Sequence, residues 1–88
     1  MLTFSQALIH LKQGIKMQRV GWNGKGMFIY HVSEGLYPAK SDAIKGIFPE
    51  DMIPYGAYLA MKTAQGNVVP WLASQTDILA EDWQTAVV

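Results

Sequence analysis

Gly21-Trp22-Asn23-Gly24-Lys25-Gly26-Met27 is the stretch on which the fold depends, because it places three glycines within seven residues. Glycine at this density is typical of backbone that takes positive φ or comes close to another group. Before it, residues 15–20 alternate between apolar and polar side chains, and after it, residues 27–32 are rich in apolar and aromatic side chains. Both patterns are typical of strands. The stretch therefore predicts a turn between two paired strands. It is longer than a minimal hairpin loop and has room to bind something.

A helix precedes these strands. Thr3 followed by Gln6 forms a capping-box pattern, and apolar residues then recur at helical spacing up to Leu11. Gly14 stands where a helix stop is expected. We predict a helix over Phe4 to Gln13 that packs its apolar side on the sheet.

Two more strands and a short helix follow in the second half. Residues 57–63 and 68–72 are separated by a Gln-Gly-Asn turn and should pair as a hairpin, with Pro70 placing the second strand at a sheet edge. Ser74 or Thr76 can cap a helical turn that runs through Leu79. Residues 82–88 are expected to form the last strand, in which Trp83 serves the core or an interface.

The segment between residues 33 and 55 resists assignment, because prolines and glycines interrupt every candidate element. The interrupting residues are Gly35, Pro38, Gly46, Pro49 and Pro54. We predict a long irregular connection there, which either covers a pocket or partner or simply wraps the surface. The fold class that results is α+β: a small twisted antiparallel sheet with one N-terminal helix packed on it, in a single domain, residues 1–88.

Composition narrows the classes of function. The chain has 88 residues, of which 50% are hydrophobic and 11% aromatic. A domain this small buries only roughly 60–65% of its unfolded surface, so self-association is expected. Seven basic residues balance seven acidic ones, whereas a general nucleic-acid binder shows a basic excess. Without cysteine there are no disulfides or thiolate sites. No apolar stretch resembles a signal peptide or a membrane span, and we expect a soluble cytosolic protein.

The sequence does not match the common catalytic or cofactor-binding motifs. Gly24-Lys25 is followed by glycine and a strand-like run, which fits neither a phosphate-binding P-loop nor a dinucleotide fingerprint. His10 and His31 have no second metal ligand at a suitable spacing. No nucleophile elbow occurs. We therefore predict no cofactor, no metal and no enzymatic activity.

A second stretch, Val69 to Asp77, repeats the composition of the glycine-rich stretch: a large ring followed by short polar groups. Stacking on a base, hydrogen bonds to its edge and a carboxylate for ribose hydroxyls are what a nucleotide ligand requires. The alternative is that the two indoles are core or interface anchors. Lys25 lies between two glycines and is the candidate for a contact with an anion. The alternative is that it is a solvated loop residue. The candidate ligand-binding residues are Trp22, Asn23, Lys25, Trp71, Ser74, Gln75, Thr76 and Asp77.

These residues also carry a family resemblance. The chain resembles the second class of Thoeris anti-defence proteins through several ungapped runs. The runs are Phe4-x-x-Ala7-Leu8, residues 21–28, Gly46-Ile47-Phe48-Pro49, Met61-Lys62-Thr63-Ala64, residues 69–77 and Ala80-Glu81-Asp82-Trp83. Residues 33–44 match least.

The resemblance implies a molecular sponge in the cytoplasm of the bacterial host. Members hold a cyclic ADP-ribose-type signal (gcADPR) without cleaving it, in pockets between the subunits of a homotetramer, and some hold cyclic oligonucleotides of another defence system. The resemblance places the ligand-binding residues by position, and their chemistry assigns Trp22 and Trp71 to stacking, Lys25 to a phosphate and Asp77 to ribose hydroxyls. The residues assigned to hydrogen bonds are Asn23, Ser74, Gln75 and Thr76. The alternatives left open are an oligomeric protein-interaction module and a small nucleotide-degrading enzyme.

Overall fold

The N-terminal helix forms as its capping box predicts. The computed structural model describes residues 1–87, and in it α1 spans Phe4–Lys12. The Thr3 side chain accepts a hydrogen bond from the backbone N–H of Gln6, whose side chain in turn accepts from the N–H of Thr3. Gly14 follows the helix with φ of +87°. Both ends are thus set by local sequence, as expected.

The main sheet has five antiparallel strands in the order β6-β5-β2-β1-β7. Their bounds are β1 Met17–Arg19, β2 Phe28–Val32, β5 Tyr58–Lys62, β6 Val68–Pro70 and β7 Trp83–Thr85. The glycine-rich stretch joins β1 to its neighbour β2, and β5 pairs with β6 as a hairpin. Pro70 lies in an edge strand, where its missing N–H removes no ladder bond. These pairings confirm the predicted α+β class. The part of the last strand predicted at Val88 lies outside the described residues.

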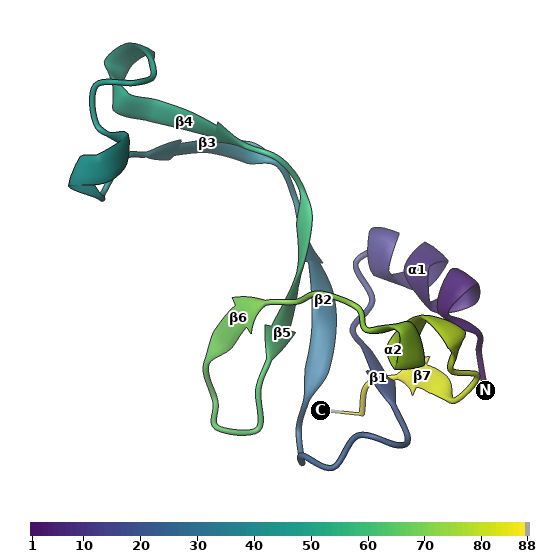
Figure 1. The fold of residues 1–88 in the computed structure, drawn as a ribbon. Helices are drawn as coiled ribbons and strands as arrows, with labels where there is room; N and C mark the ends of the chain where they lie inside the picture. Colours follow the sequence, from purple (N-terminus) through teal and green to yellow (C-terminus); the bar gives the residue numbers. More distant parts are fainter. Residues whose placement is uncertain (88) are drawn as a thin grey trace.

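The core lies between α1 and the sheet. Ala7 and Leu11 of the helix and Met17, Ile29 and Trp83 of the sheet are fully buried. Trp83 is the largest of these side chains, which confirms its assignment to the core. Figure 1 shows α1 on one side of the β1, β2 and β7 strands, with α2 (Gln75–Leu79) beside it. Neither α-helix of residues 1–87 is long and apolar enough to cross a lipid bilayer.

The segment between β2 and β5 differs from the expected irregular connection. It forms a second, two-stranded sheet of β3 (Gly35–Pro38) and β4 (Met52–Tyr55), closed at its far end by two 3-10 turns, Asp42–Ile44 and Pro49–Asp51. The prolines do not prevent pairing, because a two-stranded sheet has only edge strands and Pro38 and Pro54 need donate nothing. We call residues 35–55 the arm. It projects away from the helices and the main sheet (Figure 1).

Candidate functional site

The glycine-rich stretch is a tightly packed loop between β1 and β2. A Cβ at Gly24 would collide with the sulfur of Met27 and would lie 2.9 Å from the Cβ of Ala64. Gly26 has φ of +72°, which side chains other than glycine rarely adopt. Lys62 of β5 fixes this residue by donating from Nζ to the Gly26 carbonyl at 3.2 Å. The glycines are therefore required by the geometry of the loop.

A hollow of about 220 Å³ lies beside this loop. Its lining comes from the loop, from β1 and from the C-terminal segment: Gln18, Arg19, Val20, Trp22, Gly24, Lys25, Gly26, Met27, Gln84 and Val87. Of the predicted ligand-binding residues, Trp22 and Lys25 lie in this set. The described lining residues include no carboxylate and two cations, Arg19 and Lys25. Arg19 is paired with two carboxylates outside the lining, so Lys25 supplies the charge that favours an anionic group.

Three indoles and one phenyl ring meet next to the hollow. The centroids of Trp22 and Trp71 lie 6.4 Å apart with their planes at 67°, and Trp83 contacts both of them edge to face. Phe4 of α1 packs on Trp71 and Trp83. The two stretches singled out in the sequence are therefore neighbours. Because Trp22 and Trp71 touch each other edge to face, no base fits between them within one subunit, and stacking is left to their outer surfaces.

Arg19 connects the loop to the C-terminal segment through two carboxylates. Its Nη1 donates to Oδ1 of Asp77 and its Nε donates to Oδ1 of Asp82, both at 2.9 Å. The second oxygen of Asp82 accepts from the backbone N–H of Gly21 at 2.9 Å. Trp22 donates from its indole Nε1 to Oδ1 of Asp77 at 3.4 Å. We call Arg19, Asp77 and Asp82 the arginine clamp. It fixes where the loop begins and how the Trp22 ring is turned.

The clamp sets the protonation of its members. Burial alone would raise the pKa of Asp77, but hydrogen bonds from Arg19, Ser74 and Trp22 outweigh burial, and the pKa lies below its ordinary value. For Asp82 the hydrogen bond from Arg19 is the main cause of a lowered pKa. The same contacts raise the pKa of Arg19, led by the one to Asp82. All three groups are charged at neutral pH.

The start of α2 uses two of the predicted residues as a cap. Oγ of Ser74 accepts from the N–H of Asp77 at 3.1 Å, and Oδ2 of Asp77 accepts from the N–H of Ser74 at 3.2 Å. Ser74 is thus the cap that the sequence left open between Ser74 and Thr76, and both oxygens of Asp77 are occupied within the subunit. Gln75 and Thr76 have exposed side chains, as does Asn23 in the loop.

Sequence reasoning missed Arg19 and Asp82 as parts of this site. A signal was present, because Arg19 shares a strand face with Met17 and is paired with Trp83, and both of these are fully buried. An arginine at a core-facing position requires carboxylate partners. Its partners follow more than 50 positions later, and no local pattern indicates them.

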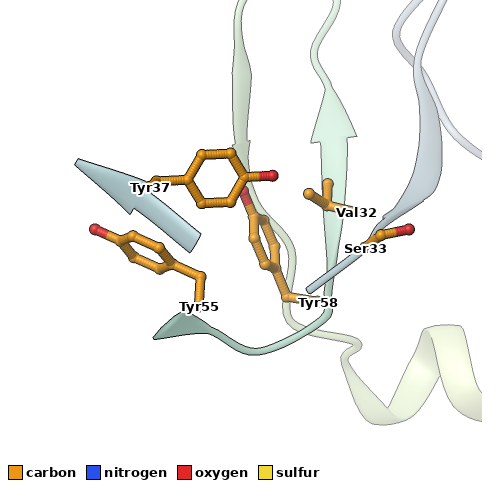
Figure 2. Close-up of a pocket in the computed structure, with 5 residues that line it drawn as sticks. All are labelled: Val32, Ser33, Tyr37, Tyr55 and Tyr58. Atoms are coloured by element: carbon orange, nitrogen blue, oxygen red, sulfur yellow. The ribbon is translucent and has the colours of Figure 1, made fainter. Parts of the chain in front are cut away.

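A second hollow lies where the arm leaves the main sheet. It measures about 320 Å³ and is lined by Val32, Ser33, Tyr37, Tyr55 and Tyr58. Figure 2 shows the three phenol rings around it. The rings of Tyr37 and Tyr55 meet edge to face, with centroids 5.7 Å apart. None of the predicted ligand-binding residues lines this hollow.

Two comparisons with known proteins agree on one family. The sequence model of the Tad2-like family, described as a Thoeris anti-defense 2-like domain, matches residues 2–86. The chain is also similar to a protein of Bacillus phage SP01 named Thoeris anti-defense 2, at 38% identity over 82 residues. That alignment covers 93% of this chain and 91% of the phage protein.

Proposed function

The chain belongs to the Tad2-like family of Thoeris anti-defense 2-like domains, and we propose that it acts by sequestration: it binds a cyclic ADP-ribose-type nucleotide (gcADPR) without cleaving it. An anti-defence role follows from the family. Holding the signal would keep it from its effector and so block Thoeris antiphage defence. The place of action is then the cytoplasm of the bacterial host, where such a signal is made.

The hollow beside the glycine-rich loop is the observation that supports this proposal. Trp22 offers a ring to a base, and Lys25 offers a cation to a phosphate. The charge of Arg19 is matched by Asp77 and Asp82, which leaves Lys25 as the lining cation for the ligand. Asn23 follows Trp22 in the loop, and Gln75 and Thr76 precede Asp77, which accepts from the Trp22 indole. All three side chains are exposed and can supply hydrogen bonds. Ser74 and Asp77 belong to the site as the cap and clamp that orient it.

The size of the hollow supports a site completed by a second subunit. Sites for drug-sized ligands measure about 300–1,000 Å³, whereas this hollow measures about 220 Å³. A cyclic dinucleotide-sized molecule would extend beyond it onto neighbouring surface. We therefore propose a homo-oligomer, as a tetramer, in which an adjacent copy closes each site. Trp71, which does not line the hollow, would then contact ligand held between subunits.

The lining also supports binding without turnover. Among the described lining residues the amine of Lys25 is the one candidate base or nucleophile, and it has no carboxylate, imidazole, hydroxyl or thiol beside it in the lining to activate it. Sequestration depends on tight binding of the ligand. To compete with an effector, binding in the nanomolar range is needed, or about −12 kcal/mol.

A retention experiment tests the proposal. The purified protein is incubated with a gcADPR isomer, free ligand is removed, and the protein is denatured by heat. Recovery of about one equivalent of intact ligand per site is the expected result. Recovery of a cleaved product, or no retention, would show that the protein is not a sponge for this molecule. Calorimetry with a panel that includes cyclic oligonucleotides tests the related possibility of a signal from another defence system.

The surface at Trp71 favours a second candidate function, that of a protein-interaction module, because the neighbouring Leu72 is 92% exposed. Under that view Trp22→Ala and Trp71→Ala should break assembly, measured by light scattering. Under the sponge proposal the assembly survives and ligand is lost. The two outcomes separate the candidates.

A further inference from the structure

Two glutamines lie side by side at the hollow beside the glycine-rich loop. Gln18 of β1 and Gln84 of β7 are directly opposed in the antiparallel pair, and both line the hollow. Each follows a fully buried core residue, Met17 or Trp83, so both side chains leave the sheet on the face turned away from α1. Directly opposed residues have Cβ atoms about 5 Å apart, which brings the two amides within reach of one small molecule. We call Gln18 and Gln84 the glutamine pair.

The amides of the glutamine pair are available to a ligand. Among residues 1–87, no side-chain hydrogen bond joins either amide to another group. Both side chains are half-buried. Every fully buried polar side-chain atom of these residues has a partner, so the unbonded amide atoms of the pair are reached by solvent. A molecule in the hollow can therefore use both their donors and their acceptors.

The chemistry of an amide favours one part of a nucleotide over the others. A phosphate only accepts hydrogen bonds, so an amide carbonyl beside it would stay unpaired, and Lys25 is the proposed phosphate contact in the same hollow. Ribose hydroxyls are commonly bound by a carboxylate, which the described part of the lining lacks. An adenine edge presents a donor next to an acceptor. A glutamine matches both at once, because its carbonyl accepts from the 6-amino group while its NH2 donates to N7.

We infer that the glutamine pair recognises the amino edge of the adenine base in the nucleotide proposed above, on whose binding this inference rests. The 6-amino group has two hydrogens and a ring nitrogen on either side of it, N7 and N1. One amide binds the N7 side and the other binds the N1 side, so that each carbonyl accepts one amino hydrogen. Two acceptors about 2.9 Å from one nitrogen lie about 5 Å apart, which agrees with the spacing of opposed strand residues.

The rest of the lining suits a base held at this edge. Val20, Met27 and Val87 give the hollow apolar side chains, and the thioether of Met27 adapts to the shape of its neighbours. Apolar walls with a few placed polar groups are typical of small-molecule sites. The four residues that the sequence assigned to hydrogen bonds lie outside the lining described for the hollow, where Gln18 and Gln84 carry the side-chain amides.

A change in the ligand tests the inference on the wild-type protein. In the 6-deamino analogue of a gcADPR isomer, purine replaces adenine and a hydrogen replaces the amino group. We expect calorimetry to give about a tenfold weaker Kd for the analogue than for the isomer itself, because both amide carbonyls lose their donor. Equal Kd values would overturn the inference and leave the sponge proposal intact. If the wild type binds neither molecule, the sponge proposal fails, and this inference fails with it.

Substitution of the pair gives the matching half of the test. Gln18→Met combined with Gln84→Met keeps the length of both side chains and removes their hydrogen-bonding groups. We expect this double variant to bind the isomer and its analogue with Kd values within about twofold of each other. Gln13→Met is the control, because Gln13 is exposed at the end of α1, and it should keep the full difference. A double variant that also keeps the full difference would refute the assignment.

The single variants keep the test decisive if the double variant does not fold. Thermal unfolding shows whether each protein is folded. In Gln18→Met and in Gln84→Met one carbonyl remains, so the difference between the two ligands should shrink to about threefold. An undiminished difference in both single variants would likewise show that other groups recognise the amino edge.

Discussion

Arg19 donates from Nη1 to Oδ1 of Asp77 at 2.9 Å, a contact that joins β1 to α2 across 58 positions of sequence. The indole of Trp22 donates to the same oxygen. One carboxylate thus holds together the two stretches that the sequence marks as binding segments. The consequences concern stability, the shape of the loop and ligand affinity.

Removal of the arginine should destabilise the subunit. Arg19→Met leaves Asp77 and Asp82 partly buried without their cation, since the side chains of these residues are only 13% and 28% exposed. Breaking a fully buried pair costs about 3–5 kcal/mol, and partial exposure reduces this, so we expect a loss of about 2–3 kcal/mol. Denaturant unfolding measures it. Lys12→Met, on the exposed side of α1, is the control, and an equal effect in both would contradict a structural role for the clamp.

The clamp should also give stability a defined dependence on acid. The pKa values of Asp77 and Asp82 are lowered in the folded protein, so the unfolded chain binds more protons between the folded values and the ordinary value of about 3.9. Their contribution is fully present above about pH 5 and is lost as the pH falls through that window. Urea unfolding between pH 7 and pH 3 tests this. In Asp77→Asn the slope should be smaller, and an unchanged slope would argue against the assignment.

Ser74 and Thr76 were equal candidates for the cap of α2 from the sequence, but in the structure Ser74 is the cap. Ser74→Ala removes the acceptor for the N–H of Asp77 and should cost about 1 kcal/mol. Thr76→Ala, inside α2 with an exposed side chain, should change the free energy of unfolding by less than about 0.5 kcal/mol. Thermal unfolding of the two variants gives the comparison. A larger loss for Thr76→Ala would mean that the cap is misassigned.

Local signals predicted much of this fold. The capping box at Thr3, the turn at Gly66 and the edge position of Pro70 each depend on residues close together in sequence. The arm was not predicted, because Pro38 and Pro54 interrupt strand patterns and only the pairing of β3 with β4 shows that both lie on edges. Pairing at that separation leaves no periodic signal in one sequence.

In the candidate site, too, local patterns indicated some residues, whereas contacts between distant segments were not predicted. The density of glycine around Trp22 and Lys25 singled them out, and the structure places both in the lining of one hollow. The clamp was not found, because its contacts depend on how β1 and β7 pair. The ligand-binding assignments of all eight residues stay predictions, and among them Asn23, Gln75 and Thr76 have side chains that are exposed in the single subunit.

Glycine at position 24 should be required for the loop. In Gly24→Ala the new Cβ would meet Met27 and Ala64, so either the loop or its neighbours must shift. We expect a loss of about 1–3 kcal/mol, the usual cost of overpacking, together with weaker ligand binding. Gly56→Ala is the matched control, because a Cβ there has no heavy atom within 4 Å. Differential scanning calorimetry compares the two, and equal midpoints would show that the loop tolerates a side chain.

Lys25 provides the most direct test of ligand chemistry at the hollow. The part of the lining that the structure describes includes no carboxylate beside this lysine, so a bound phosphate would gain a charge-assisted hydrogen bond there. Such bonds contribute about 1.5–3 kcal/mol, and for an exposed lysine we take the lower end, which corresponds to about a tenfold weaker Kd in Lys25→Ala. The affinity of the wild type should also fall as salt rises, and that dependence should be smaller in the variant. Lys45→Ala removes the same charge from the far end of the arm and should bind as the wild type does. Calorimetry with the same gcADPR isomer, at two salt concentrations, measures both effects. If Lys25→Ala and Lys45→Ala bind alike, the phosphate lies elsewhere and the hollow is not the anion site.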